Sequence, residues 1–293
     1  MNRMLRLRHL IMVLLLLPMT SKPVPVAAQQ ELRQEQEQRL LFLTYAGLYA
    51  HPSLADAERV VTELGRQGGF QVTTLQGYQQ DLEEMDLSFL TPDYLSQFDA
   101  LMLFTNGNLP MTVEQKQGLL NFVEQGGGLI GTHAATLTFY DFAPFGEMLG
   151  AYFKGAVAQD RIIVLDVEDT THPATRMLGP AWPVVDEFYR FGTGVWSPGQ
   201  PDENVDELFG LPIPVAFSRD RVNVLLSINT ALTDLEGLPL QPGGDYPQSW
   251  WRDYGSGRVF YTSFGHSPDT WNYNQVFQQH LLGGIRWALG LEE

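Results

Sequence analysis

The sequence has 293 residues, of which 44% are hydrophobic and 18% charged, a balance that excludes a disordered chain and predicts one large domain. The formal net charge of −16 excludes a nucleic-acid-binding protein or one that binds anionic membrane surfaces, because phosphate contacts require Lys and Arg. Since the chain has no cysteine, disulfide bonds, a thiolate nucleophile and a lipid-anchored cysteine are excluded as well.

The first 28 residues have the features of a secretory signal peptide. Basic residues precede an apolar segment from Leu10 to Met19 that is too short to span a bilayer, and Val26-Ala27-Ala28 offers a small-residue cleavage site. Cleavage after Ala28 makes the mature protein periplasmic or secreted, without a stable membrane span. It removes four basic residues and no acidic one, so the formal charge moves from −16 to −20. An uncleaved membrane anchor is the alternative, and residues 29–38, rich in Gln and Glu, are expected to form a flexible lead-in.

The first part of the expected domain alternates between strands and helices. Apolar or alternating runs predict three strands, at residues 40–45, 70–75 and 99–104. A helix with one apolar face is expected over 54–66, ended by Gly68-Gly69. A second helix is expected after Thr112, an N-cap with Gln115 placed to complete a capping box. This alternation predicts a parallel sheet covered by helices.

The segment 126–135 is the one around which the chain is organised. Its sequence, Gly-Gly-Gly-Leu-Ile-Gly-Thr-His-Ala-Ala, joins a short apolar strand to His133, which stands between small neighbours. A buried parallel strand delivers such a side chain to the carboxyl edge of an open α/β sheet, where these folds bind ligands. The pattern is similar to a nucleophile elbow, a sharp strand-to-helix turn that exposes one reactive side chain. Because the residue at the tip is His, the chemistry has to begin from an imidazole.

The second half of the chain has fewer regular patterns. A short helix plus a loop is expected over 139–160, and an irregular insertion of the kind that often carries function over 168–220. Further strands are predicted at residues 161–167, 222–228 and 258–264. The last strand ends at Gly265-His266, and one helix from Trp271 to Leu289 closes the chain with large apolar residues on its inner face.

Five motifs follow one another in an order that is typical of a known family. They are the Gly47…His51 loop, residues 126–133, His172-Pro173, Asp186-Glu187-Phe188-Tyr189 and residues 254–266. With these motifs the chain resembles the trehalose-utilisation (ThuA-like) family over about residues 39–289. The resemblance implies a single ThuA-like α/β domain over 39–293 with the flavodoxin-like fold of class I glutamine amidotransferases. That fold is a three-layer sandwich around a mostly parallel central sheet.

For the function, the resemblance implies an enzyme that acts on a carbohydrate derivative, either an oxidised keto-sugar or a glycoside. In amidotransferases of this fold the elbow carries a Cys and a later strand end carries a His. Here those places hold His133 and His266, so glutamine hydrolysis by a thiolate is excluded. The chain departs from the family where a His-Pro pair usually follows a Gly-x-Phe segment, since residues 152–157 are Tyr-Phe-Lys-Gly-Ala-Val. If that His serves the family's site, this protein has lost it.

His133 and His266 are expected to face one crevice above the sheet. Two imidazoles that titrate near neutrality suit acid–base catalysis or coordination of a divalent metal ion by the two histidines, which His51 could join. Asp186 or Glu187 could supply a carboxylate, and Glu187 is the one predicted to be catalytic. Removal of a proton beside a carbonyl, in a hydrolytic, eliminating or isomerising reaction, needs such a base and a group that polarises the oxygen. Each histidine can also be a structural residue that only forms hydrogen bonds, and that alternative stays open.

A sugar-like small molecule is the expected ligand, because aromatic rings stack on the C–H faces of a neutral polyol. The residues predicted to bind it are His51, Tyr189, Trp251 and Trp271. The alternative function is a non-catalytic module that binds a carbohydrate or a protein partner on an inherited enzyme fold. A metallohydrolase of another substrate class is disfavoured because the sequence has no His-Glu-x-x-His motif, and a dehydrogenase because no Gly-x-Gly-x-x-Gly follows the first strand.

Overall fold

The computed structural model describes residues 37–79, 85–157, 161–192, 213, 216–236, 238 and 244–293. The expected signal peptide and nearly all of the expected lead-in lie outside these residues, as does part of the insertion expected over 168–220. Residues 37–293 form one compact unit by their internal contacts. Among the helices in the described ranges, none combines the length and the apolar character needed to cross a bilayer.

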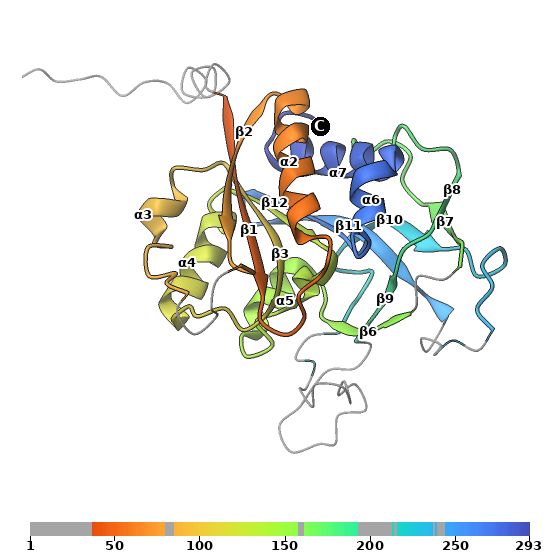
Figure 1. Cartoon of the computed structure of the whole chain (residues 1–293), viewed down its shortest axis with the longest axis horizontal. Coiled ribbons are helices and arrows are strands. Elements are labelled where there is room, and N and C mark those ends of the chain that lie inside the picture. The colour runs from red at the N-terminus through yellow and green to blue at the C-terminus, as the bar shows by residue number, and fades with distance from the viewer. Residues whose placement is uncertain are drawn as a thin grey trace, which may run out of the picture. The chain divides into compact units, whose positions relative to one another are not determined.

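One sheet runs through this unit in the strand order β2-β1-β3-β4-β12-β11-β10-β7-β8, and it is parallel from β2 to β12 (Figure 1). The parallel strands are β2 (Phe70–Gln76), β1 (Gln38–Ala46), β3 (Ala100–Gly107), β4 (Gly128–Thr132) and β12 (Gly257–Thr262). A short strand, β5 (Leu137–Thr138), also pairs in parallel with β3. Every residue of β3 and β4 is buried, as expected for parallel strands that are covered on both faces.

Antiparallel strands extend the sheet beyond β12. They are β11 (Pro247–Tyr254), β10 (Asn223–Ile228), β7 (Ile163–Val167) and β8 (Ala181–Val184). A separate two-stranded sheet pairs β6 (Phe153–Val157) with β9 (Phe188–Phe191). The strand β12 is therefore the place where the parallel part of the sheet meets the antiparallel part.

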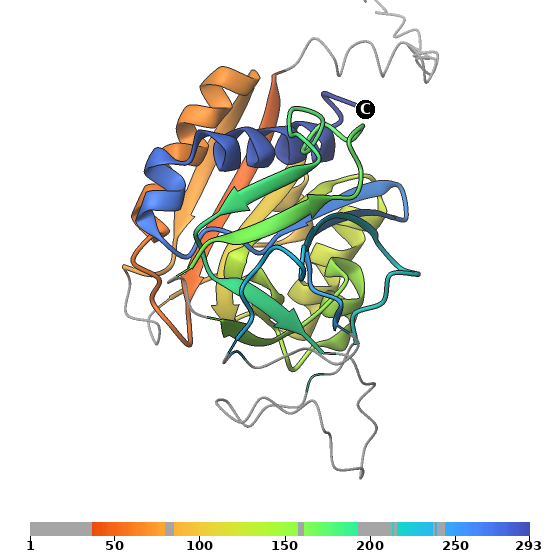
Figure 2. The same ribbon diagram turned by 90° about the vertical axis from the view of Figure 1, so that its right-hand side faces the viewer.

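Helices cover both faces of the parallel strands and give the protein three layers (Figure 1, Figure 2). The helices of one face are α2 (Leu54–Gly68), α6 (Pro268–Tyr273) and α7 (Gln275–Ala288), and α7 contacts β4 and β12. Those of the other face are α3 (Pro92–Leu95), α4 (Val113–Glu124) and α5 (Ala143–Leu149), of which α4 and α5 contact β12. This α/β architecture, with parallel strands at its centre, is the predicted fold class.

Local sequence signals set the ends of two helices. α4 begins at a capping box, in which Gln115 N donates to Thr112 Oγ1 at 3.2 Å and Thr112 N donates to Gln115 Oε1 at 3.0 Å. α2 ends at Gly69, whose φ of +74° is the left-handed conformation that glycine adopts after a helix. The capping box and the glycine stop predicted from the sequence are confirmed.

Three expectations for the second half of the chain were wrong. β6 lies in the loop expected within 139–160, and β8 and β9 lie in the insertion expected to be irregular, because strands of four or five residues carry little periodicity. β11, which begins at Pro247, was not predicted, so Trp251 lies in a strand. The closing helix is two helices: the Asn274 side chain accepts a hydrogen bond from Phe277 N at 3.0 Å and so starts α7 as a separate helix.

Candidate functional site

His133 is the residue that β4 presents at the carboxyl edge of the sheet. It begins the 3₁₀ helix η1 (His133–Thr136), with a φ of +45°. A left-handed conformation costs a non-glycine residue about 1–3 kcal/mol and persists only where the surroundings hold it. Here Tyr261 Oη donates to the His133 carbonyl at 2.8 Å, and the imidazole is 0% exposed. The turn therefore presents an imidazole where a nucleophile elbow presents its reactive side chain.

Two hydrogen bonds determine which nitrogen of His133 carries the proton. Nδ1 lies 2.7 Å from the Ser263 carbonyl oxygen, which can only accept, so Nδ1 must be the N–H donor of the neutral ring. Nε2 then has the free lone pair and accepts from Tyr189 Oη at 2.9 Å. Glu187 Oε2 lies 3.8 Å from the same Nε2. The reactive nitrogen of His133 thus faces a phenol and a carboxylate.

His266 follows β12 in a turn that depends on Gly265. The φ of Gly265 is +124°, and a Cβ added there would lie 3.0 Å from the Trp271 ring. The Gly265 carbonyl accepts two hydrogen bonds, from Ser53 Oγ at 2.7 Å and from Trp271 Nε1 at 2.8 Å. The two hydrogen bonds and the packing against Trp271 fix the backbone of this turn, and the turn thereby positions the imidazole of His266.

Asp186 and Glu187 are adjacent in the chain but have different surroundings. Asp186 is buried, and its two oxygens accept from Gly265 N and from Glu187 N, each at 2.8 Å. Glu187 Oε2 lies 3.0 Å from His266 Nδ1 and is partly open to solvent. Asp186 therefore fixes the backbone on both sides of the site, while Glu187 faces the histidines.

His51 comes from the loop that follows β1. Asn106, in β3, holds this loop: its Oδ1 accepts from Leu48 N at 2.7 Å and Tyr49 N at 3.0 Å, and its Nδ2 donates to Tyr49 O at 2.8 Å. The buried His51 ring packs edge-to-face against Tyr49, with 4.8 Å between the ring centroids. Since the Tyr49 side chain is 53% exposed, it forms a rim between the histidines and solvent.

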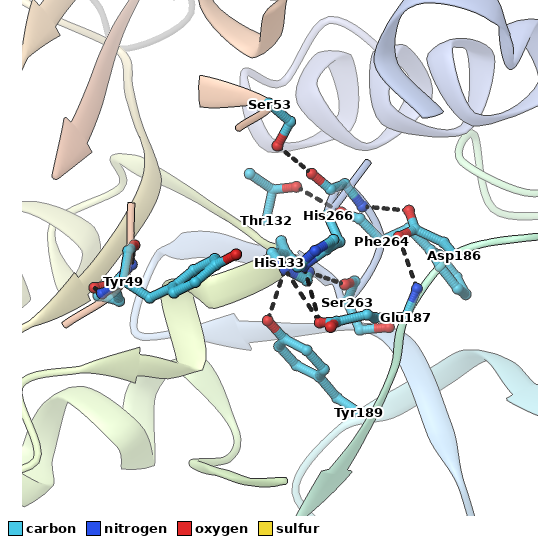
Figure 3. A network of polar contacts seen from close by, with 12 residues as sticks. Tyr49, Ser53, Thr132, His133, Asp186, Glu187, Tyr189, Ser263, Phe264 and His266 are labelled. Atoms are coloured by element: carbon cyan, nitrogen blue, oxygen red, sulfur yellow. Dashed lines mark hydrogen bonds and ion pairs between the residues drawn. The ribbon is translucent and has the colours of Figure 1, made fainter. Parts of the chain in front are cut away.

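The three histidines form one cluster at the carboxyl ends of β1, β4 and β12. Figure 3 shows two of them, His133 and His266, beside Glu187 and Tyr189. One ring nitrogen from each of His51, His133 and His266 lies within 4.8 Å of the others. Their rings are nearly perpendicular in pairs, at 84°, 85° and 76°, with centroids 4.6–5.3 Å apart. This arrangement can transfer protons between a substrate and Glu187, or it can surround a cation.

Burial shifts the pKa of several groups in the site. It lowers the pKa of His51 to about 3, with a contribution from the neighbouring His266, and it lowers that of His133 well below its usual value. Burial also raises the pKa of the Tyr189 hydroxyl, and that of the Asp186 carboxyl to about 6. At neutral pH, His51 and His133 are therefore neutral rings with free lone pairs, and Tyr189 is a protonated donor.

Five of the seven residues predicted for the site lie together. They are His51, His133, Glu187, Tyr189 and His266. Their common location follows from the parallel topology, because strand ends that are distant in sequence meet at one edge of the sheet. The roles assigned to them from the sequence stay predictions.

The two predicted tryptophans do not line the cluster. Trp251 stacks on His172 at 5.7 Å between ring centroids and packs against Trp287 at 5.1 Å, and neither residue belongs to the cluster of three histidines. Trp271 is 0% exposed and donates to the Gly265 carbonyl beneath the site. It positions the turn before His266 and has no open ring face for a ligand.

Residues that hold the site were missed in the sequence. Gln248 joins β9 to the end of β12: its Oε1 accepts from Tyr189 N at 2.9 Å and Ser263 Oγ at 2.6 Å, and its Nε2 donates to Tyr189 O at 2.8 Å. It lies in β11, a strand that was not predicted, so no pattern identified it. Asn106 and Tyr49 follow predicted strands, and that position was the available signal.

Comparisons with known proteins identify the family and agree with the fold. A family model described as trehalose utilisation matches residues 39–288. A ThuA-like protein from Parabacteroides merdae has a TM-score of 0.63 and 19% identity, over 88% of this chain and 91% of the other. A ThuA-like protein from Bacteroides uniformis has a TM-score of 0.62 and 19% identity, over 86% of this chain and 91% of the other.

A cytoplasmic protein from Salmonella typhimurium is also similar, with a TM-score of 0.53 and 14% identity over 87% of this chain and 98% of the other. At these identities the structural matches show a shared fold, that of glutamine amidotransferases. They carry no information about activity. No curated protein matches the chain.

Proposed function

The chain belongs to the trehalose-utilisation (ThuA) family, and from that premise we propose that it is an exported enzyme acting on a carbohydrate derivative, a keto-sugar or a glycoside. Export rests on the signal-like sequence of residues 1–28, and the carbohydrate on the family. The observation that carries the enzymatic part is Glu187 Oε2, which lies 3.0 Å from His266 Nδ1 and 3.8 Å from His133 Nε2. A carboxylate between two imidazoles at the edge of a parallel sheet suits proton transfer.

In this proposal Glu187 is the general base. It removes a proton from the carbon or hydroxyl next to a carbonyl of the sugar, and His266 stabilises the carboxylate in the orientation that faces the substrate. Tyr189 donates its hydroxyl hydrogen to the developing oxyanion, because burial keeps the hydroxyl protonated at neutral pH. Before the substrate binds, this hydrogen is donated to His133 Nε2, and it turns to the oxyanion as the oxyanion forms. The same groups serve a hydrolytic, eliminating or isomerising step.

The rim of the site suits the sugar. Tyr49 is exposed, and its ring lies parallel to the His266 ring, 18° between planes and 6.3 Å between centroids. An exposed aromatic ring next to polar side chains is the usual surface for the C–H face of a sugar. Tyr49 is therefore the ring that we propose contacts the ligand, in place of the two tryptophans predicted from the sequence.

The test is the Glu187→Gln variant on a panel of keto-disaccharides and glycosides. Loss of a general base should lower kcat about 10²–10⁴-fold, with a small change in KM. Glu63→Gln, an exposed glutamate on α2 that pairs only with surface groups, is the matched control and should keep wild-type turnover. Wild-type turnover in Glu187→Gln would exclude Glu187 as the base.

The second candidate is a non-catalytic carbohydrate-binding module. Ala156, in the segment without the family's usual His-Pro pair, lies directly opposite Tyr189 in the β6–β9 pair, so the departure is close to the site. If the protein is such a binding module, the wild-type protein should bind the sugar saturably without turnover. Unchanged binding in Glu187→Gln, with no product from any substrate of the panel, would favour it over the enzyme.

A further inference from the structure

We propose that His51, His133 and His266 bind a divalent transition-metal cation of the Zn²⁺ type and leave a coordination position open toward Glu187 and Tyr189. The sequence predicted His133 and His266 as metal ligands that His51 could join, and in the structure the three histidines lie together. The use of the cation in a reaction rests on the proposed function. Its binding does not, since a cation can occupy the three imidazoles without turnover.

The ligand geometry is close to that of a three-histidine site. The three ring nitrogens lie within 4.8 Å of one another, on rings that are nearly perpendicular in pairs. In a tetrahedral site with Zn–N bonds of about 2.0–2.1 Å, ligand nitrogens are roughly 3.4 Å apart. Side-chain movements of about 1 Å toward a common point therefore suffice to bind the cation.

Each ligand is held by groups behind it, as metal-binding histidines usually are. His133 donates its Nδ1 hydrogen to the Ser263 carbonyl at 2.7 Å, which leaves Nε2 for the cation. Asn106 holds the loop of His51, and the bonds to Gly265 hold the turn of His266. These hydrogen bonds hold the three histidines in position without a bound cation.

His51 gives a second, independent observation. Its Nδ1 is buried and, like Nδ1 of His266 in the same cluster and Nε2 of His172 outside it, has no hydrogen-bond partner among the described residues. Buried polar atoms normally have a partner, and one without calls for a reason such as a bound ion or water. A cation in contact with this ring supplies that reason.

The donor set selects the class of cation. Three imidazoles favour Zn²⁺ and its neighbours among the transition metals over Mg²⁺ and Ca²⁺, which prefer oxygen ligands. Three protein ligands with a fourth position open are the pattern of catalytic rather than structural zinc. Glu187 and Tyr189 then face the open position, and Tyr189 must release its hydrogen bond to His133 Nε2 when the cation enters.

The experiment uses the mature protein without a polyhistidine tag, treated with chelator and titrated with Zn²⁺ and with Co²⁺. We expect one equivalent of Zn²⁺ per chain by calorimetry and by elemental analysis. In the titration with Co²⁺, we also expect the visible absorption bands that are typical of a four- or five-coordinate Co²⁺ ion. His51→Ala should weaken binding by at least the roughly 10–100-fold that changes behind a ligand cause. His172→Ala, which removes a buried histidine outside the cluster, should bind like wild type.

Glu187→Gln separates the cation from the reaction. It should keep one equivalent of Zn²⁺ while losing turnover, because Glu187 faces the open position and is not one of the three ligands. If folded wild-type protein binds neither Zn²⁺ nor Co²⁺, the metal site is wrong and metal-free acid–base chemistry stands. If His51→Ala keeps its circular dichroism spectrum and binds Zn²⁺ as wild type does, the assignment of ligands is wrong.

Discussion

Gly265→Ala tests the claim that the turn before His266 is held rigidly. The added Cβ would stand 3.0, 3.1 and 3.2 Å from three atoms of the Trp271 ring, and the φ of +124° is one that side chains rarely allow. Backbone strain costs about 1–3 kcal/mol and crowding in a packed interior about 1–3 kcal/mol more. Trp271 cannot move aside freely, since it is buried and its Nε1 donates to the Gly265 carbonyl. We expect a loss of about 2–6 kcal/mol in the free energy of unfolding.

Gly69→Ala is the matched control. Its φ of +74° is also left-handed, but no described atom lies within 4 Å of a Cβ built there, so it should lose only the strain, about 1–2 kcal/mol. Urea unfolding of both variants measures the difference. A loss of 1 kcal/mol corresponds to about 2–4 °C in Tm for a chain of this size. The Tm of Gly265→Ala should therefore be at least several degrees below that of the wild-type protein. Equal losses in the two variants would refute the packing argument.

Two further predictions concern Tyr189 and His280. Tyr189→Phe removes the donor to His133 Nε2, so turnover should fall about 10–100-fold, while the free energy of unfolding changes by only about 1 kcal/mol; a variant with wild-type kcat would rule out the phenol as a proton donor. Burial lowers the pKa of His280 to about 4 in the folded protein, so the unfolded chain binds more protons between pH 4 and 6.5. Its contribution, about 3 kcal/mol, is present above pH 6.5 and is lost as the pH falls toward 4. Urea unfolding at pH 5 and pH 7.5 should show a smaller loss in His280→Gln than in wild type.

The parallel part of the fold was predictable because its sequence signals are local and redundant. β3 and β4 are buried on both faces and therefore appear as continuous apolar runs, and Gly69 and the Thr112 capping box mark helix ends. Once strand and helix alternate, the parallel topology follows, and it places His133 and His266 at one edge. The resemblance of the five motifs to the ThuA-like family implied the same fold, independently of the pattern of strands and helices.

The antiparallel part was less predictable because its contacts are tertiary. β6 and β9 form a two-stranded sheet of their own, and their pairing brings Ala156 opposite Tyr189 across 33 positions of sequence. The role of Gln248 depends on Tyr189 and Ser263, which lie on two other segments, and no local pattern announces it. Aromatic residues near motifs are likewise ambiguous: Trp271 supports the turn from beneath, and the exposed Tyr49 is the ring beside the histidines.

The surroundings of Asp186 and Glu187, the two carboxylates that the sequence left open, are the reason why we propose Glu187 as the base. Both oxygens of Asp186 are occupied, by Gly265 N and Glu187 N, so proton transfer at Asp186 would break a bond that holds the site. Its raised pKa, to about 6, results from burial and reflects this enclosed position. Glu187 makes no such backbone bond through the oxygen that faces His266 and His133, and its side chain is 18% exposed. We therefore propose that Glu187 moves the proton, while the adjacent Asp186 binds the backbone next to both Glu187 and His266 and keeps the two side chains close to each other.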